Sequence, residues 1–135
     1  MKATVIAAVS DMLFASKIRA TAEHLNIKVL FAKNAVAVID AAREIKPSLI
    51  IFDLHERECD PFATAARIKA DEDLRGTKLL GFYSHVDTAL RRAAEAVGFD
   101  KVMPRSRFTK YLADILQEND QQINGEKSGE ELAHI

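Results

Sequence analysis

Short apolar runs alternate with stretches of mixed polarity along most of this chain. Unbroken apolar runs of this length are typical of buried strands, whereas apolar residues recurring every three or four positions predict helices. The predicted strands are residues 4–9, 28–31, 48–53, 78–83 and 102–103. The predicted helices are residues 14–25, 35–45, 61–70 and 87–97, and a last helix bearing Phe108, Tyr111, Leu112, Ile115 and Leu116.

Residues with turn and capping preferences mark the ends of several helices. Pro61 suits the first turn of the third helix, where its missing N–H costs nothing, and the charged stretch 71–76 is predicted to be a connection. Gly98 suits the C-terminal cap of the fourth helix. Ser106 is predicted to cap the N-terminus of the last helix. The inward face of the fourth helix is predicted to carry Leu90, Ala93, Ala94 and Val97.

The alternation of five strands with five helices predicts one α/β domain. With right-handed crossovers it gives a doubly wound (βα)5 parallel sheet of five strands in a three-layer α/β/α arrangement. We expect this domain to span residues 1–118. Residues 119–135 are rich in Asn, Gln, Gly, Ser and Glu without an apolar period. They are predicted to form a disordered polar tail, at least from Gly125 onward.

Charge and composition exclude several classes of function. The net charge of −1 favours neither nucleic acid nor an acidic partner. The N-terminal apolar run is too short to cross a membrane and has no signal-peptide cleavage pattern. The single cysteine, Cys59, cannot form a disulfide within the chain, which fits a reducing compartment. We therefore expect a cytoplasmic protein that binds neither nucleic acid nor membrane.

Asp53 ends the most apolar predicted strand, Leu49-Ile50-Ile51-Phe52-Asp53. In open α/β sheets, ligands and chemistry collect at the carboxyl ends of the strands. A carboxylate there must be solvated, paired with a cation or used in chemistry. Asp53 is therefore the main candidate for a functional residue, and an inert rim carboxylate is the alternative interpretation.

The order of these residues resembles the receiver domains of two-component response regulators, which are chemotaxis-regulator-like proteins with a flavodoxin-like fold. The resemblance covers residues 3–118. It is carried by Ser10-Asp11 after the first strand, Asp53 after the third, Asp60-Pro61-Phe62 at the third helix, Ser84 after the fourth strand, and Gly98-Phe99-Asp100 leading to Pro104-Arg105-Ser106.

The resemblance implies a phosphorylation site with Asp53 as the phospho-acceptor. It implies that Asp11 and Asp53, with the backbone carbonyl of His55, hold Mg²⁺, and that Ser84 contacts the phosphoryl oxygens. Attack of a carboxylate on a phosphoryl group joins two negative species, so the chemistry needs such cations. Helix capping by Asp11 is the alternative to metal binding.

Two positions depart from the pattern of the family. Ser10 stands where the first acid is expected, and Arg105 stands where a lysine is expected, with Pro104 before it rather than a proline after it. A planar guanidinium does not replace a compact ammonium at a phosphate site. Mg²⁺ binding is therefore expected to be weakened or absent, and Arg105 could pair permanently with Asp53.

Three hypotheses follow from the sequence. The first is a degenerate stand-alone receiver (a pseudo-receiver) that works independently of phosphorylation. The second is an active Mg²⁺-dependent phospho-acceptor, whose only enzymatic steps would be self-phosphotransfer and autodephosphorylation at Asp53. The third is a small flavodoxin-like protein that binds an anion at Ser84, Arg105 and Asp53, although a Gly-rich phosphate loop is missing.

The predicted partners are proteins. The resemblance implies a sensor kinase or phosphotransfer protein as input and a downstream target as output, since the sequence contains no DNA-binding or enzymatic output segment. It also implies a homodimer through the face made by the fourth helix, fifth strand and fifth helix. A solvated helix surface is the alternative for this face, whose cations are Arg91, Arg92, Arg105, Arg107 and Lys110.

Overall fold

The computed structural model describes residues 4–85 and 87–118. Its strands are Thr4–Ala8 (β1), Lys28–Phe31 (β2), Leu49–Asp53 (β3), Lys78–Tyr83 (β4) and Lys101–Pro104 (β5). Its helices are Met12–His24 (α1), Ala35–Ile45 (α2), Pro61–Ala70 (α3), Thr88–Val97 (α4), Arg105–Lys110 (α5) and Leu112–Leu116 (α6). The predicted tail, residues 119–135, lies outside the described residues.

The five strands form one parallel sheet in the order β2-β1-β3-β4-β5. β1 and β3 are neighbours, yet the chain leaves them toward opposite edges of the sheet. Such a reversal of strand order opens a crevice at the carboxyl ends of the two strands. The predicted doubly wound fold is confirmed, and the crevice lies beside the segments that follow Ala8 and Asp53.

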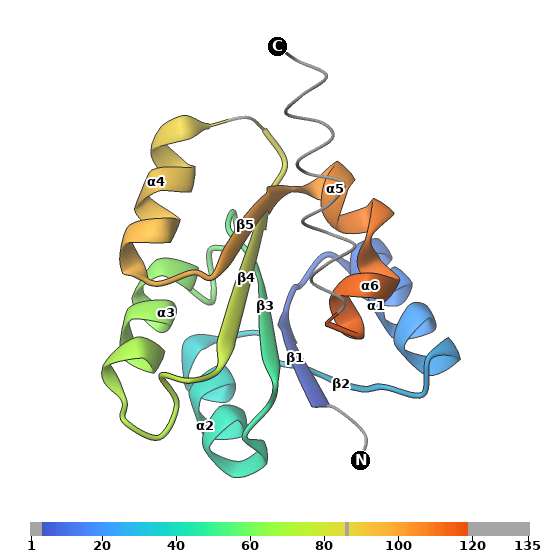
Figure 1. Ribbon diagram of the computed structural model, residues 1–135, viewed down its shortest axis with the longest axis horizontal. Coiled ribbons are helices and arrows are strands. Elements are labelled where there is room, and N and C mark those ends of the chain that lie inside the picture. Colours follow the sequence, from blue (N-terminus) through green and yellow to red (C-terminus); the bar gives the residue numbers. More distant parts are fainter. Residues whose placement is uncertain (1–3, 86, 119–135) are drawn as a thin grey trace.

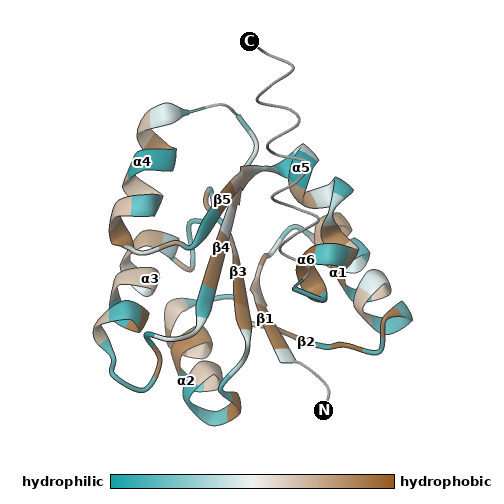
Figure 2. Ribbon diagram, viewed as in Figure 1, coloured by the Kyte–Doolittle hydropathy of each residue, from teal (hydrophilic) through white to brown (hydrophobic). Residues whose placement is uncertain are grey.

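The helices cover both faces of the sheet (Figure 1). α2, α3 and α4 pack on one face, and α1, α5 and α6 pack on the other. β3 contributes to both cores because its side chains alternate: Ile50 and Phe52 belong to the first core, and Leu49 and Ile51 to the second. Figure 2 shows the resulting apolar strands at the centre of the molecule. No helix within residues 4–85 and 87–118 is long and apolar enough to span a bilayer.

The last helical region differs from the prediction. Ser106 is not an N-cap: the extended backbone of Pro104 precedes α5, which begins at Arg105, so Ser106 lies inside the first turn. The helix is also interrupted at Tyr111, whose backbone angles (φ −106°, ψ 19°) separate α5 from α6. This break leaves the Tyr111 ring buried with the guanidinium of Arg107 over it, at 5.0 Å from the ring centre.

Two smaller corrections concern β5 and α4. β5 extends beyond the predicted residues 102–103, because its pairing with β4 continues from Lys101 to Pro104. Ala93 is exposed on α4 rather than inward, whereas Ala94 is fully buried. A single alanine contributes little to the apolar face, so the sequence pattern could not decide which of two adjacent alanines points inward.

Side-chain caps begin four of the helices in the described part of the chain. Asp11, Asn34, Asp60 and Asp87 each accept a hydrogen bond from the backbone N–H three residues later. Each cap satisfies a donor that the helix itself cannot pair. The cap at Asp11 anchors the start of α1 close to Asp53.

Gly98 ends α4 with a positive φ of 112°, a conformation that strains other residues. A Cβ there would also lie 2.7 Å from Cγ of Lys69, whose ammonium is held by the carbonyls of Arg75 and Thr77. We expect Gly98→Ala to lower the free energy of unfolding by more than about 1 kcal/mol in urea denaturation. Gly76→Ala is the matched control, because a Cβ on Gly76 meets nothing within 4 Å, and it should change stability by less than about 0.5 kcal/mol.

Candidate functional site

The candidate residues gather at the carboxyl edge of the sheet. Asp11 follows β1, Asp53 is the last residue of β3, Ser84 follows β4 and Arg105 follows β5. Parallel strands bring these four positions to one edge although they are far apart in the sequence. Asp53 is the most buried member of the charged set, with 14% of its side chain exposed, against 43% for Asp11 and 35% for Arg105.

Asp53 uses its two carboxylate oxygens differently. Its Oδ1 accepts a hydrogen bond from the backbone N–H of His55 at 2.9 Å. Its Oδ2 lies 3.9 Å from Nη2 of Arg105. The first contact fixes the loop after β3, and the second gives the half-buried carboxylate a positive neighbour. Asp53 is therefore paired with a cation.

Asp11 divides its carboxylate in the same way. Oδ1 caps α1 by accepting a hydrogen bond from Phe14 N–H at 3.0 Å, and Oδ2 lies 3.6 Å from Nη2 of Arg105. The capping interpretation of Asp11 is thus correct for this conformation. One nitrogen of Arg105 faces both carboxylates, Asp11 and Asp53.

Aromatic rings hold the Arg105 guanidinium in place. Its carbon Cζ lies 4.4 Å from the centre of the Phe14 ring and 5.7 Å from that of Phe82. These two rings pack on each other at 4.9 Å between centres. A guanidinium over an aromatic face is attracted by the ring quadrupole, and its flat shape also allows it to stack on the ring. The Nε atom of Arg105 is buried and has no hydrogen-bond partner among the described residues.

Glu56 is a member of the site that sequence reasoning missed. Its Oε2 accepts a hydrogen bond from the Ser10 hydroxyl. Its Oε1 accepts from the backbone N–H groups of Arg57 at 3.1 Å and Glu58 at 3.3 Å. A carboxylate therefore lies beside Ser10, where the family pattern has an acid at the serine position itself. The only sequence signal was its place three residues after Asp53, because Ser10 and Glu56 are far apart in the chain.

The remaining predicted residues lie at the rim. His55 and Ser84 are exposed, and the rings of His55 and His85 meet edge to face with centres 6.4 Å apart. Cys59 lies nearby in the sequence but is fully buried. Burial raises the pKa of the Cys59 thiol, which disfavours the reactive thiolate.

The side chains as placed do not fit Mg²⁺. Mg²⁺ requires octahedral oxygen ligands at about 2.1 Å, but the Arg105 guanidinium faces the two outward carboxylate oxygens, on Asp11 and Asp53. Within residues 4–85 and 87–118, no three His, Cys, Asp or Glu side chains are grouped so as to hold a metal ion. The same guanidinium is flanked by carboxylates that repel an anion, which disfavours the anion-binding hypothesis.

Many solved structures share this fold, although no protein-family model and no curated protein sequence matches the chain. The chemotaxis response regulator CheY4 of Vibrio cholerae aligns with a TM-score of 0.75 at 15% identity, over 91% of this chain and 99% of that one. A response regulator from Hahella chejuensis gives 0.78 at 16% identity, over 86% and 93%. The phosphorylated cyanobacterial phytochrome response regulator RcpA gives 0.74 at 14% identity, over 90% and 93%.

This chain has the receiver fold. The resemblance to receiver domains is thus confirmed for the architecture. The order of the strands and the position of Asp53 at the end of β3 agree with it. Sequence identities this low support a shared fold but not a shared chemistry. Asp53 occupies the edge of the receiver fold at which strand order reverses, and what it does there depends on its neighbours Asp11, Glu56 and Arg105.

Two substitutions of Asp11 separate its cap from its ion pair. Asp11→Ala removes both and should lower the free energy of unfolding by about 1 kcal/mol, the usual worth of an N-cap. Asp11→Asn keeps the capping oxygen and removes only the charge, so it should cost less than about 0.5 kcal/mol, because a partly exposed ion pair contributes little. Urea denaturation measures both. Equal losses for the two variants would mean that the pairing with Arg105, and not the cap, stabilises this region.

Proposed function

We propose that this chain is a receiver-like signalling module of two-component type that acts through protein–protein contacts without phosphorylation of Asp53. The observation that carries the proposal is the position of the Arg105 guanidinium, whose Nη2 faces Asp11 at 3.6 Å and Asp53 at 3.9 Å. The chain itself thus supplies a cation that both carboxylates share. It needs no metal for that purpose.

The other contacts of the two acids support this proposal. Each carboxylate has its Oδ1 in a hydrogen bond with the backbone and its Oδ2 toward Arg105. A divalent cation would have to displace the guanidinium from its stacked position over Phe14. Ser10 adds no negative charge to compensate for that loss, and its hydroxyl is bonded to Glu56. The guanidinium thus offsets one of the two negative charges of Asp11 and Asp53 without a metal ion.

An active phospho-acceptor at Asp53 is the second candidate, and several observations favour it. The ion pairs of Arg105 involve partly exposed side chains, and such pairs are typically worth less than about 1 kcal/mol, so they open easily. The Nε–H of Arg105 has no acceptor among the described residues, and a phosphoryl oxygen would supply one. Ser84 at the end of β4 would offer a hydroxyl to the same group. RcpA, one of the structural neighbours, was solved phosphorylated.

Partners would be proteins in either case. We propose a sensor kinase or phosphotransfer protein on the input side and a target protein on the output side. The face of α4, β5 and α5 remains the proposed dimer or output surface. Its cations are partly engaged, because Arg91 pairs with Glu95 at 3.7 Å and Arg107 and Lys110 lie over the Tyr111 ring. Arg105 faces the acids instead of this surface, whereas Arg91 and Arg92 on α4 both have exposed side chains.

A phosphoryl analogue tests the proposal directly. With millimolar Mg²⁺ and beryllofluoride, amide NMR signals near Asp53 should keep the positions that they have without these ligands. The reason is that the Arg105 guanidinium already faces the outward oxygens of both Asp11 and Asp53, which Mg²⁺ and beryllofluoride would need. Asp53→Asn is the control that identifies shifts arising at this residue. A set of saturating shifts around Asp53, lost in the variant, would replace the proposal by the phospho-acceptor function.

The double substitution Ser10→Asp with Arg105→Lys tests whether those two residues are the cause. It restores an acid for the metal and replaces the planar stacked group by a compact ammonium. We expect this variant to gain Mg²⁺-dependent beryllofluoride shifts, and we expect adding Asp53→Asn to abolish them. If the double variant remains folded and silent, the block lies elsewhere in the site, with Glu56 as the first residue to examine.

A further inference from the structure

Two histidines lie side by side at the carboxyl edge of the sheet. His55 follows β3 and His85 follows β4. Their rings meet edge to face, with centres 6.4 Å apart and planes at 66° to each other. The proposed function uses neither imidazole. Because the nitrogen of a neutral imidazole is the commonest ligand for transition metals in proteins, two adjacent imidazoles indicate a candidate metal site.

The pairing of β3 with β4 brings the two histidines together. Asp53 is in register with Phe82, and the N–H of Leu54 donates to the carbonyl of Phe82 at 2.9 Å, which extends the pairing beyond the end of β3. The N–H of His55 donates to Oδ1 of Asp53 at 2.9 Å. His85 comes two residues after the end of β4. The sheet therefore anchors the two loops next to each other.

Both imidazoles are accessible to a ligand. His55 and His85 are exposed. Within residues 4–85 and 87–118, neither ring forms a hydrogen bond or an ion pair, and the contact between the two rings is the interaction that they make. Each ring can therefore turn about its side-chain bonds and offer Nδ1 or Nε2 to an ion.

The separation of the rings is compatible with one shared ion. A zinc–nitrogen bond of about 2.1 Å places the ion about 3.2 Å from the ring centre, so two rings on one ion have centres about 5 to 6.5 Å apart, depending on the angle at the ion. The observed 6.4 Å lies at the upper end of this range. In an edge-to-face contact one ring presents its face, so that ring must rotate before a nitrogen of each ring points to the same ion.

The two nitrogens select the class of ion. Zn²⁺, Ni²⁺ and Cu²⁺ accept imidazole ligands, whereas Mg²⁺ prefers oxygen. Structural zinc sites have four protein ligands and catalytic sites usually have three. A site with two protein ligands holds its ion more weakly and completes its coordination with water. The pair is thus suited to an exchangeable ion rather than a structural one.

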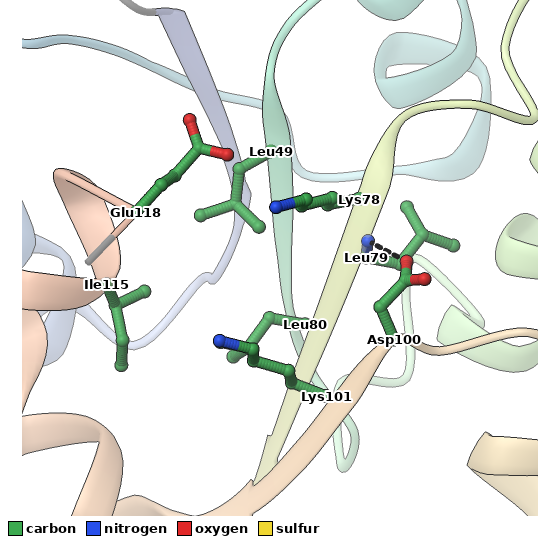
Figure 3. Close-up of a pocket in the computed structure, with 8 residues that line it drawn as sticks. All are labelled: Leu49, Lys78, Leu79, Leu80, Asp100, Lys101, Ile115 and Glu118. Carbon is green, nitrogen blue, oxygen red and sulfur yellow. Dashed lines mark hydrogen bonds between the residues drawn. The ribbon is translucent and has the colours of Figure 1, made fainter. Parts of the chain in front are cut away.

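The opposite edge of the sheet offers no such ligands. A cavity of about 170 Å³ opens there, among the first residues of β3, β4 and β5 and the end of α6 (Figure 3). It is lined by apolar side chains, two lysines and the carboxylates of Asp100 and Glu118. Asp100 already accepts a hydrogen bond from Leu79 N–H at 2.8 Å and pairs with Lys69 at 3.3 Å. A transition-metal ion is therefore expected at the histidine pair and not in this cavity.

We propose that His55 and His85 together bind one divalent transition-metal ion such as Zn²⁺, with water in the remaining coordination positions. The bound ion ties the loop after β3 to the loop after β4, beside Asp53 and Ser84. This site is separate from the carboxylates of Asp11 and Asp53, and it does not depend on whether Asp53 is phosphorylated.

Imidazole NMR on the full chain tests the proposal with Zn²⁺ alone as the probe. The ring signals of His55 and His85 should shift together, with a stoichiometry of one ion per chain, while those of His24 stay unchanged. Excess Mg²⁺ should move neither ring. A shift of only one of the two rings, an equal shift of His24, or shifts confined to the amides of Asp11 and Asp53 would overturn the proposal.

Single substitutions supply the second measurement, made by titration calorimetry in a His134→Ala background so that this fourth histidine does not contribute. His55→Ala and His85→Ala should each weaken Zn²⁺ binding at least about tenfold, since the loss of even an outer-shell partner of a metal ligand has an effect of that size. His24→Ala is the matched control, because His24 is also exposed but lies at the end of α1, and it should leave the affinity unchanged.

Two results of these measurements would contradict the proposal. If either His55→Ala or His85→Ala retains the affinity of the unsubstituted pair, the two imidazoles do not share an ion. If Zn²⁺ binds only with formation of a dimer in analytical ultracentrifugation, each ion bridges two copies of the chain, and the site within one chain is wrong.

Discussion

The placement of β3 between β1 and β4 is the constraint on which the rest of this structure depends. Residues Leu49 to Phe52 are fully or almost fully buried because helices cover both faces of the strand. A strand so placed must be apolar along its whole buried length, and its first polar residue must come where the strand leaves the sheet. That residue is Asp53. The burial of β3 therefore has two consequences: it stabilises the fold, and it determines where the candidate site lies.

The reversal of strand order between β1 and β3 explains which residues surround Asp53. Asp11 and Asp53 are brought to one edge by neighbouring strands, and two carboxylates so placed need positive charge between them. In this chain Arg105 supplies it from the start of α5, held by stacking on Phe14 and close to Phe82. Binding to the guanidinium and binding to a metal ion are alternatives for the same carboxylate oxygens. The two proposed functions differ in which of these two interactions prevails.

The two edges of the sheet carry different kinds of side chain. The carboxyl edge gathers exposed polar groups, including the Ser10–Glu56 hydrogen bond, on loops that a partner can reach. The amino edge carries the cavity between β3, β4, β5 and α6, whose lining combines apolar side chains with two lysines and two carboxylates.

The sequence by itself determined the fold class and the position of Asp53. The period of apolar residues distinguishes strands from helices, and buried parallel strands must be continuous apolar runs, so both features are local. The tertiary structure alone decided what surrounds Asp53, because those contacts join residues that are distant in the chain. The pairing of Arg105 with Asp53 was predicted only as one option, and neither its contact with Asp11 nor the contact between Ser10 and Glu56 was predicted. Side chains that meet across a sheet edge leave no periodic pattern in the sequence, since loop conformation and competition for charge decide which of them touch.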